Sequence, residues 1–153
     1  MSHSHNVVSY AVALNYRVGI DIELHDNALN IQELTSLVFT KAESKYFSTL
    51  KSDEKLEFFY SLWTKKESLI KATGQGLSYP INTIEAVALS SGEKIILNNE
   101  KNKLYQEWYY YKLETPQHYS GSIAIEHKID EMIYLNMDKQ QNIFDNIRLK
   151  CLS

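Results

Sequence analysis

A long helix-forming run in the middle of the sequence constrains the fold more than any other feature. Its start is predicted at Ser52, since serine caps a helix and the two acids that follow favour the positive end of the helix dipole. The helix is expected from Asp53 to about Thr73. Gly74 and Gly76 follow it, and glycine readily takes the left-handed conformation that closes a helix.

Two shorter helices are predicted before the long one. Thr40 and Glu43 have the spacing of a capping box, in which each side chain bonds a free backbone N–H at the helix start. A helix should therefore run from Lys41 to about Leu50. A short helix is also expected from Ile31 to Val38, after a polar loop over His25 to Asn30.

Strands are expected on both sides of the helices. Before them, the pattern predicts strands over Val7–Leu14 and Arg17–Glu23, joined by a turn at Asn15–Tyr16. After Pro80 we expect strands at Glu85–Leu89, Lys94–Leu97, Tyr105–Leu113 and Ser120–His127, a turn at Asn98–Asn102, and an extension of the sheet over Ile129–Met137. Strands, then helices, then strands predict one α+β domain over residues 1–153, with helices packed on an antiparallel sheet.

Composition excludes several classes of protein. A chain of 153 residues with 44% apolar and 23% charged residues has the balance of a soluble globular domain. A net charge of −3 does not indicate a nucleic-acid surface, and no apolar run reaches the length of a membrane span. There is no signal-peptide pattern at the N-terminus, and the single cysteine cannot form an internal disulfide. We therefore expect a cytoplasmic protein.

Two acids alternate with apolar residues in the second predicted strand. Side chains of a strand point alternately to opposite faces, so Val18, Ile20 and Ile22 should face the core while Asp21 and Glu23 share the other face. Paired carboxylates suit a hard cation such as Mg²⁺, which prefers oxygen ligands. The alternative is a solvated strand with two surface acids, and this cluster alone favours that alternative.

A third acid lies on the apolar stripe of the long helix. Advancing about 100° per residue places Glu67 in the middle of that stripe, where an ionised carboxylate must be paired, protonated or bound to a metal. Lys71 lies one turn further on and Lys66 flanks the site from the other side. An internal ion pair between Glu67 and Lys71 and a functional site explain the pattern equally well.

Three stretches, taken in their order along the chain, resemble the signature of the 4′-phosphopantetheinyl transferase superfamily. The chain is most similar to the surfactin-synthetase-activating type, in which a Ser-His-Ser element precedes the first acidic motif, as Ser2-His3-Ser4 does here. The matching stretches are Gly19-Ile20-Asp21-Ile22-Glu23, Phe39-Thr40-Lys41-Ala42-Glu43, and Trp63-Thr64-Lys65-Lys66-Glu67-Ser68-Leu69-Ile70-Lys71 followed by Gly74-Gln75-Gly76-Leu77.

The resemblance implies an activity and a role for each of these residues. It implies transfer of 4′-phosphopantetheine from coenzyme A to a serine of an acyl or peptidyl carrier protein. Asp21, Glu23 and Glu67 would hold Mg²⁺, and Glu67 is also a candidate base for the serine proton. Lys71 and Lys66 would contact the phosphates of coenzyme A. His3 would lie beside one of these phosphates.

The chain departs from the resemblance in length, because it matches only the second of the two similar halves of surfactin-type enzymes. Three explanations stay open: a homo-oligomer in which a neighbour replaces the missing half, a half that needs a partner chain, or a non-catalytic remnant that binds coenzyme A or a carrier protein. A structural α+β domain without a site is the most distant alternative. No nucleic acid or membrane is expected as a partner.

Overall fold

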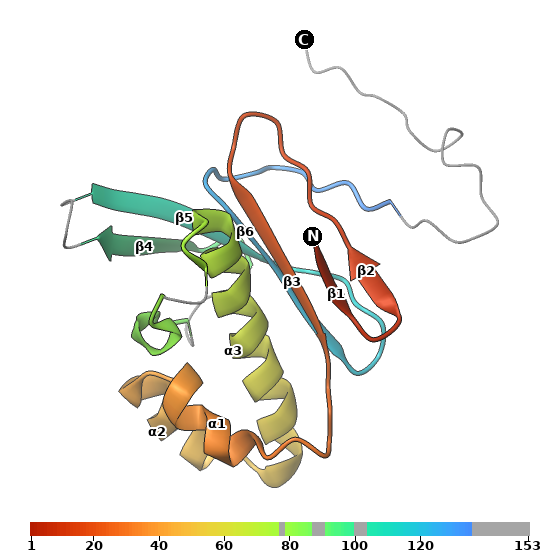
Figure 1. Ribbon diagram of the computed structural model, residues 1–153, viewed down its shortest axis with the longest axis vertical. Coiled ribbons are helices and arrows are strands. Elements are labelled where there is room, and N and C mark those ends of the chain that lie inside the picture. The colour runs from red at the N-terminus through yellow and green to blue at the C-terminus, as the bar shows by residue number, and fades with distance from the viewer. Residues whose placement is uncertain (77–78, 87–90, 100–103, 136–153) are drawn as a thin grey trace.

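The computed structural model describes residues 1–76, 79–86, 91–99 and 104–135 (Figure 1). Within these ranges the elements follow in the order β1 (Ser2–Ser4), β2 (Val7–Ser9), β3 (Val18–Leu24), α1 (Ile31–Val38), α2 (Lys41–Thr49), α3 (Ser52–Thr73), the 3-10 helix η2 (Ile81–Thr83), β4 (Lys94–Asn99), β5 (Leu104–Lys112) and β6 (Tyr119–Ile125). None of the helices in the described part of the chain is long and apolar enough to span a membrane.

An antiparallel sheet with the strand order β3-β6-β5-β4 forms the centre of the domain. Helix α3 lies across one face of this sheet and contacts β3 and β6 (Figure 1). Helices α1 and α2 gather at the first half of α3, and the β1–β2 hairpin lies beside β3. The predicted α+β class, with helices packed on an antiparallel sheet, is confirmed.

Both faces of the sheet are covered, which corrects the expectation that the core lies on one face only. Ile20 packs with Leu113, Ile123 and Ile125 on the face away from α3. On the face toward α3, Leu69 and Ile70 of the helix pack with Trp108 and Ala124, among others. Asp21 and Glu23 do share a face, as predicted, but it is the face that α3 covers, because a hydrogen bond and an ion pair join Asp21 to Lys71 of that helix.

Helix α3 touches the backbone of β3 at Gly19. A Cβ atom added to this glycine would lie 2.0 Å from the carbonyl oxygen of Ser68 and 2.4 Å from the amide nitrogen of Ala72. Both of these neighbours are backbone atoms of α3 and cannot rotate away. The two elements can approach this closely only because residue 19 has no side chain.

A buried ion pair joins α2 to α3. The Nζ atom of Lys66 lies 2.5 Å from Oε2 of Glu43, both side chains are fully buried, and Nζ also donates to the carbonyl oxygen of Val38 at 2.6 Å. Glu43 additionally accepts hydrogen bonds from the backbone N–H groups of Thr40 and Ala86. This one pair of charges therefore connects four segments: α1, α2, α3 and the segment that contains Ala86. Burial lowers the pKa of Lys66, and Glu43 opposes that effect.

The helix boundaries agree closely with the sequence analysis. Helix α1 has the predicted bounds, and the predicted capping box of Thr40 and Glu43 begins α2. Helix α3 starts one residue earlier than expected, with Lys51 as its cap: the backbone N–H of Lys51 donates to Glu54. Gly74 closes α3 in the left-handed conformation, with φ of 70°.

The strands depart from prediction at the ends of the chain. Only Val7–Ser9 of the predicted strand 7–14 is a strand, and the strand Ser2–Ser4 was not predicted. Residues 129–135 do not extend the sheet, and Glu85 and Ala86 form no strand. Asn98 and Asn99 belong to β4 rather than to a turn. The remaining parts of these predictions, residues 87–89, 100–102 and 136–137, lie outside the described residues.

Replacement of Gly19 by alanine should destabilise the domain strongly, because α3 has to move away from β3. We expect a loss of at least about 3 kcal/mol in the free energy of unfolding, measured by urea titration. Gly74→Ala is the matched control: no atom lies near its Cβ position, so only the left-handed conformation should cost free energy, about 1 kcal/mol. Equal losses in the two variants would contradict the close contact.

Replacement of Lys66 by methionine should also destabilise the domain, since it leaves the Glu43 carboxylate buried without a cation. The expected loss is about 3–5 kcal/mol in the same titration. Lys45→Met is the control, because this lysine of α2 is exposed and its replacement should change stability much less. A Lys66→Met variant as stable as the wild type would refute the structural role of the pair.

Candidate active site

Asp21 is the centre of the site and is almost completely buried, with 1% of its surface exposed. Its Oδ1 atom accepts a hydrogen bond from Nζ of Lys71 at 2.6 Å and one from Oγ of Ser2 at 2.9 Å. Its Oδ2 atom is buried and has no hydrogen-bond partner among the described residues. A buried carboxylate oxygen normally has a partner, so this atom is placed to accept a further ligand.

Two serines of β1 fix the acids of β3. Ser2 donates to Asp21 and accepts the backbone N–H of Ile22 at 3.3 Å. Two residues further along both strands, Ser4 donates to Oε2 of Glu23 at 2.9 Å and accepts the backbone N–H of Leu24 at 3.0 Å. Each hydroxyl thus holds one carboxylate oxygen and one N–H of the free edge of β3.

Glu23 and Glu67 are partly buried beside Asp21, and both titrate abnormally. Burial raises the pKa of Glu67; the charge of Asp21 raises it further, Lys71 lowers it, and Glu23 raises it. Burial also raises the pKa of Glu23, a hydrogen bond from Ser4 lowers it, and the charge of Asp21 raises it. The three acids therefore repel one another, and Lys71 offsets this repulsion only in part.

The donor chemistry of these residues fits a hard divalent cation. Three carboxylates of β3 and α3 interact with one another, and Oδ2 of Asp21 is buried without a hydrogen-bond partner in the part of the chain that the structure describes. As the side chains stand, no three acid, histidine or cysteine side chains in the described ranges are close enough together to hold a metal ion. Cation binding therefore requires side-chain rotation, with Lys71 giving up part of its contact to Asp21.

The other residues predicted for the site are placed differently. Lys71 lies in the site, and its side chain is 38% exposed. Of the two alternatives for Glu67, the internal ion pair with Lys71 is not formed, because the Lys71 ammonium pairs with Asp21. His3 is exposed on β1, on the strand face opposite to Ser2 and Ser4. Lys66 does not belong to the site: it is fully buried against Glu43, so the prediction that it contacts phosphates is wrong in this structure.

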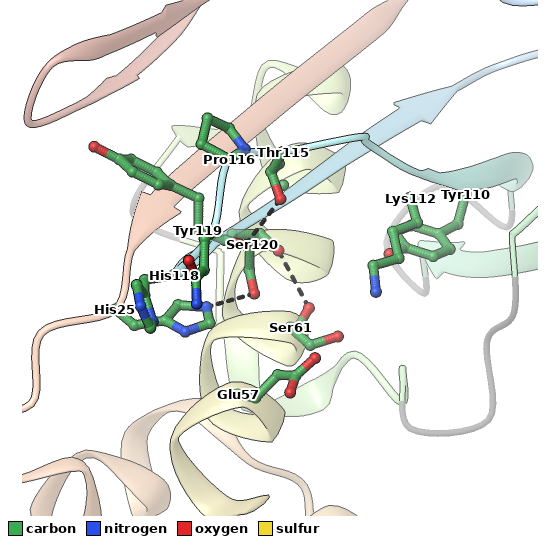
Figure 2. A pocket seen from close by; sticks show the side chains of 13 residues that line it. His25, Glu57, Ser61, Tyr110, Lys112, Thr115, Pro116, His118, Tyr119 and Ser120 are labelled. Carbon is green, nitrogen blue, oxygen red and sulfur yellow. Dashed lines mark hydrogen bonds between the residues drawn. The ribbon is translucent and has the colours of Figure 1, made fainter.

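A polar pocket of about 390 Å³ opens between the first half of α3 and the β5–β6 connection. Figure 2 shows His25, Glu57, Ser61 and Lys112 around it, and none of the three site carboxylates lines it. The Nε2 atom of His25 lies 2.9 Å from the hydroxyl of Ser120, and its ring stacks on Tyr60 with centroids 5.0 Å apart. Burial lowers the pKa of His25, which favours the neutral imidazole.

Ser2, Ser4 and His25 are functional candidates that only the structure reveals. The alternation in Ser2-His3-Ser4 places both serines on one strand face, which is the sequence signal that they can act as a pair. His25 begins the predicted polar loop, although it also continues the alternation of Asp21 and Glu23. In the structure it lies immediately after β3 and lines the pocket.

Comparison with known proteins gives a consistent match. The family model described as "4'-phosphopantetheinyl transferase superfamily" matches residues 17–124. The 4′-phosphopantetheinyl transferase HetI of Nostoc sp. is 32% identical over 78 residues, which cover 51% of this chain and 33% of the relative. The L-aminoadipate-semialdehyde dehydrogenase-phosphopantetheinyl transferase of Rattus norvegicus is 28% identical over 157 residues, covering 93% of this chain and 50% of the relative.

Among solved structures, the holo-[acyl-carrier-protein] synthase of Thermotoga maritima aligns with a TM-score of 0.48 and 18% identity, covering 73% of this chain and 63% of that chain. The chain spans about a third of the length of HetI and half of the length of the Rattus norvegicus relative. The family model covers the acids of β3 and all of α3, the two elements that build the site. This chain belongs to the 4′-phosphopantetheinyl transferase superfamily.

Proposed function

We propose that this domain transfers the 4′-phosphopantetheine group of coenzyme A to a serine of an acyl or peptidyl carrier protein. The observation that carries the proposal is the buried Oδ2 of Asp21, which has no partner among the described residues and lies beside two further carboxylates and a lysine. A purely structural salt bridge gives no reason for a buried carboxylate oxygen without a hydrogen-bond partner. A site that receives a cation and a diphosphate needs both acids and a nearby ammonium group.

Asp21, Glu23 and Glu67 are the proposed ligands of Mg²⁺. When bound, the ion would neutralise charge that develops on the diphosphate oxygens during transfer. Burial, and then the charge of Asp21, raise the pKa of Glu23 and Glu67, and the repulsion among the three acids favours cation binding. Ser2 and Ser4 each occupy one carboxylate oxygen and so limit which oxygens face the ion.

The transfer itself requires a base and a cation beside the leaving group. The carrier serine oxygen attacks the β-phosphorus of coenzyme A, the bond to the bridging oxygen breaks, and 3′,5′-adenosine bisphosphate leaves. Glu67 is the proposed acceptor of the serine proton, and its raised pKa suits this role. The half-exposed Lys71 can turn from Asp21 toward the diphosphate. His3, exposed on β1, is the proposed contact to a further phosphate of coenzyme A.

The first prediction of this proposal concerns transfer to a carrier protein. With Mg²⁺ and coenzyme A, the wild-type chain should add the mass of one phosphopantetheine to an apo carrier protein, measured by mass spectrometry. Glu67→Gln should reduce the rate by about 10²–10⁴-fold, the range expected for a general base. Glu131→Gln, a change of the same kind at an exposed position, should leave the rate unchanged.

The outcomes separate the proposal from its alternatives. Equal rates for Glu67→Gln and wild type would contradict the assigned base and ligand. No transfer by any variant, with coenzyme A binding retained, would support a non-catalytic binding domain, or one half of a transferase that needs a partner chain. The short coverage of the relatives is the observation that favours such a half.

The second prediction concerns the cation and pH. Without Mg²⁺ at neutral pH, Glu67→Gln should be more stable than the wild type, since it removes a repelling charge. Because the pKa of Glu67 is raised by folding, this advantage should be complete above the raised pKa. It should disappear below the ordinary glutamate pKa of about 4.3. Urea titrations across pH measure the difference.

Addition of Mg²⁺ should reverse the order of stability at neutral pH. The wild type should be stabilised by ion binding, and Glu67→Gln should gain less because it has lost a charged ligand. A wild type whose unfolding midpoint does not respond to Mg²⁺, in the presence or absence of coenzyme A, would contradict the cation site.

A further inference from the structure

Two hydroxyls of β1 repeat the same hydrogen-bonding pattern along the edge of β3. Ser2 donates to Oδ1 of Asp21 at 2.9 Å and accepts the backbone N–H of the residue after that acid at 3.3 Å. Ser4 donates to Oε2 of Glu23 at 2.9 Å and accepts the N–H of the residue after that acid at 3.0 Å. Since the pattern recurs two residues further along both strands, it belongs to the way in which the strands meet.

The hydroxyl proton of Ser2 is directed at the carboxylate by the other bonds of the same oxygen. A serine hydroxyl has one proton to donate and two lone pairs that accept. The Ser2 oxygen accepts the N–H of Ile22 at 3.3 Å and the ammonium of Lys71 at 3.1 Å, so its proton remains for Asp21. With 6% of Ser2 exposed, water hardly competes for this bond. Ser2 is thus a fixed donor that stays in place when Lys71 turns away.

The two oxygens of Asp21 are therefore not equivalent. Oδ1 accepts hydrogen bonds from Ser2 and Lys71, whereas Oδ2 is buried and accepts none from the residues that the structure describes. A carboxylate binds a cation through both oxygens only when both face the ion. As long as Ser2 holds Oδ1, Asp21 presents Oδ2 alone. Ser4 occupies Oε2 of Glu23 in the same way and leaves at most Oε1 for an ion.

We propose that Ser2 and Ser4 are positioning residues that select Mg²⁺ over Ca²⁺ by restricting Asp21 and Glu23 to one oxygen each. This inference rests on the cation site of the proposed function. Ca²⁺ takes about six to eight oxygen ligands and often uses both oxygens of a carboxylate. Mg²⁺ is octahedral, keeps several waters and needs few carboxylates. Single carboxylate oxygens therefore suffice for Mg²⁺ and leave Ca²⁺ short of ligands.

A purely structural role of the two hydroxyls is the alternative, in which they only hold the β1–β2 hairpin against β3. That role accounts for their bonds to backbone N–H groups, but it gives no reason why each hydroxyl proton lies on a carboxylate of the site. Loss of a structural support weakens the binding of both ions alike. Loss of a group that restricts the carboxylates changes the ratio of the two affinities, so this ratio is the quantity to measure.

Competition against Mn²⁺, followed by electron paramagnetic resonance of the purified chain without coenzyme A or carrier protein, measures both affinities. The wild type should bind Mg²⁺ more tightly than Ca²⁺. Ser2→Ala should weaken Mg²⁺ binding by about 10–100-fold, the range for loss of a group that orients a metal ligand. Ca²⁺ binding should weaken much less, because Asp21 can then turn both oxygens toward the ion. The preference for Mg²⁺ should therefore fall by at least about 10-fold.

Three further variants complete the experiment. Ser2→Thr keeps a hydroxyl and should restore the wild-type preference. Ser9→Ala is the matched control and should leave the preference unchanged: Ser9 lies opposite Ser2 in the same hairpin, and its hydroxyl has no hydrogen-bond partner among the described residues. Ser4 is less buried than Ser2, so Ser4→Ala, which should also lower the preference, serves if Ser2→Ala does not fold. A urea titration checks the folding of each variant.

The outcomes decide between selection and support. An unchanged preference in folded Ser2→Ala or Ser4→Ala would overturn the proposal, whether or not both ions bind more weakly. A wild type that binds Ca²⁺ as tightly as Mg²⁺, or binds neither ion, would overturn it as well. A chain that shows the expected ratios but transfers no phosphopantetheine would refute the proposed function and leave this inference standing. Transfer by the wild type, with a preference that the variants do not change, would do the opposite.

Discussion

The approach of α3 to the backbone of β3 at Gly19 is the constraint on which the rest of the structure depends. Backbone atoms of Ser68 and Ala72 occupy the place of a side chain at residue 19, so helix and strand lie closer together than any other residue there would allow. Asp21, two residues along the strand, is thereby held against the turn of the helix that carries Lys71. The same contact buries the acid, so packing and electrostatics of the site have one cause.

Burial of the like-charged carboxylates is tolerated because neighbouring groups donate hydrogen bonds to them. The Lys71 ammonium and the Ser2 hydroxyl both donate hydrogen bonds to Oδ1 of Asp21, and the Ser4 hydroxyl donates one to Glu23. Burial raises the pKa of Glu23 and Glu67, and the charge of Asp21 raises both further. By contrast, the pair of Glu43 and Lys66 is locally neutral and fully satisfied, so it stabilises the helices and leaves nothing for a ligand. Two acid–lysine pairs whose lysines both lie on α3 thus have different physical roles.

Local sequence signals predicted the helices well, because caps act within a few residues: Thr40, Glu43 and Gly74 each perform the expected task. These local signals failed where contacts between distant parts of the chain determine which strands form and which side chains are buried. Of the strand pattern over residues 7–14, only Val7–Ser9 pairs with another strand, β1, within the described residues. The shared face of Asp21 and Glu23 followed from alternation, but its coverage by α3 did not. Lys66 and Lys71 have similar sequence surroundings, and only the fold shows that one is buried beside Glu43.

We propose that the acids of β3 and α3 together bind a divalent cation. Anomalous diffraction from a crystal grown with Mn²⁺ and coenzyme A can locate this ion, since Mn²⁺ accepts the same oxygen ligands as Mg²⁺. We expect an anomalous peak between Asp21, Glu23 and Glu67, in contact with Oδ2 of Asp21, with Lys71 turned toward the diphosphate. A peak elsewhere, or no peak, with Lys71 still paired to Asp21, would show that these acids do not form the cation site.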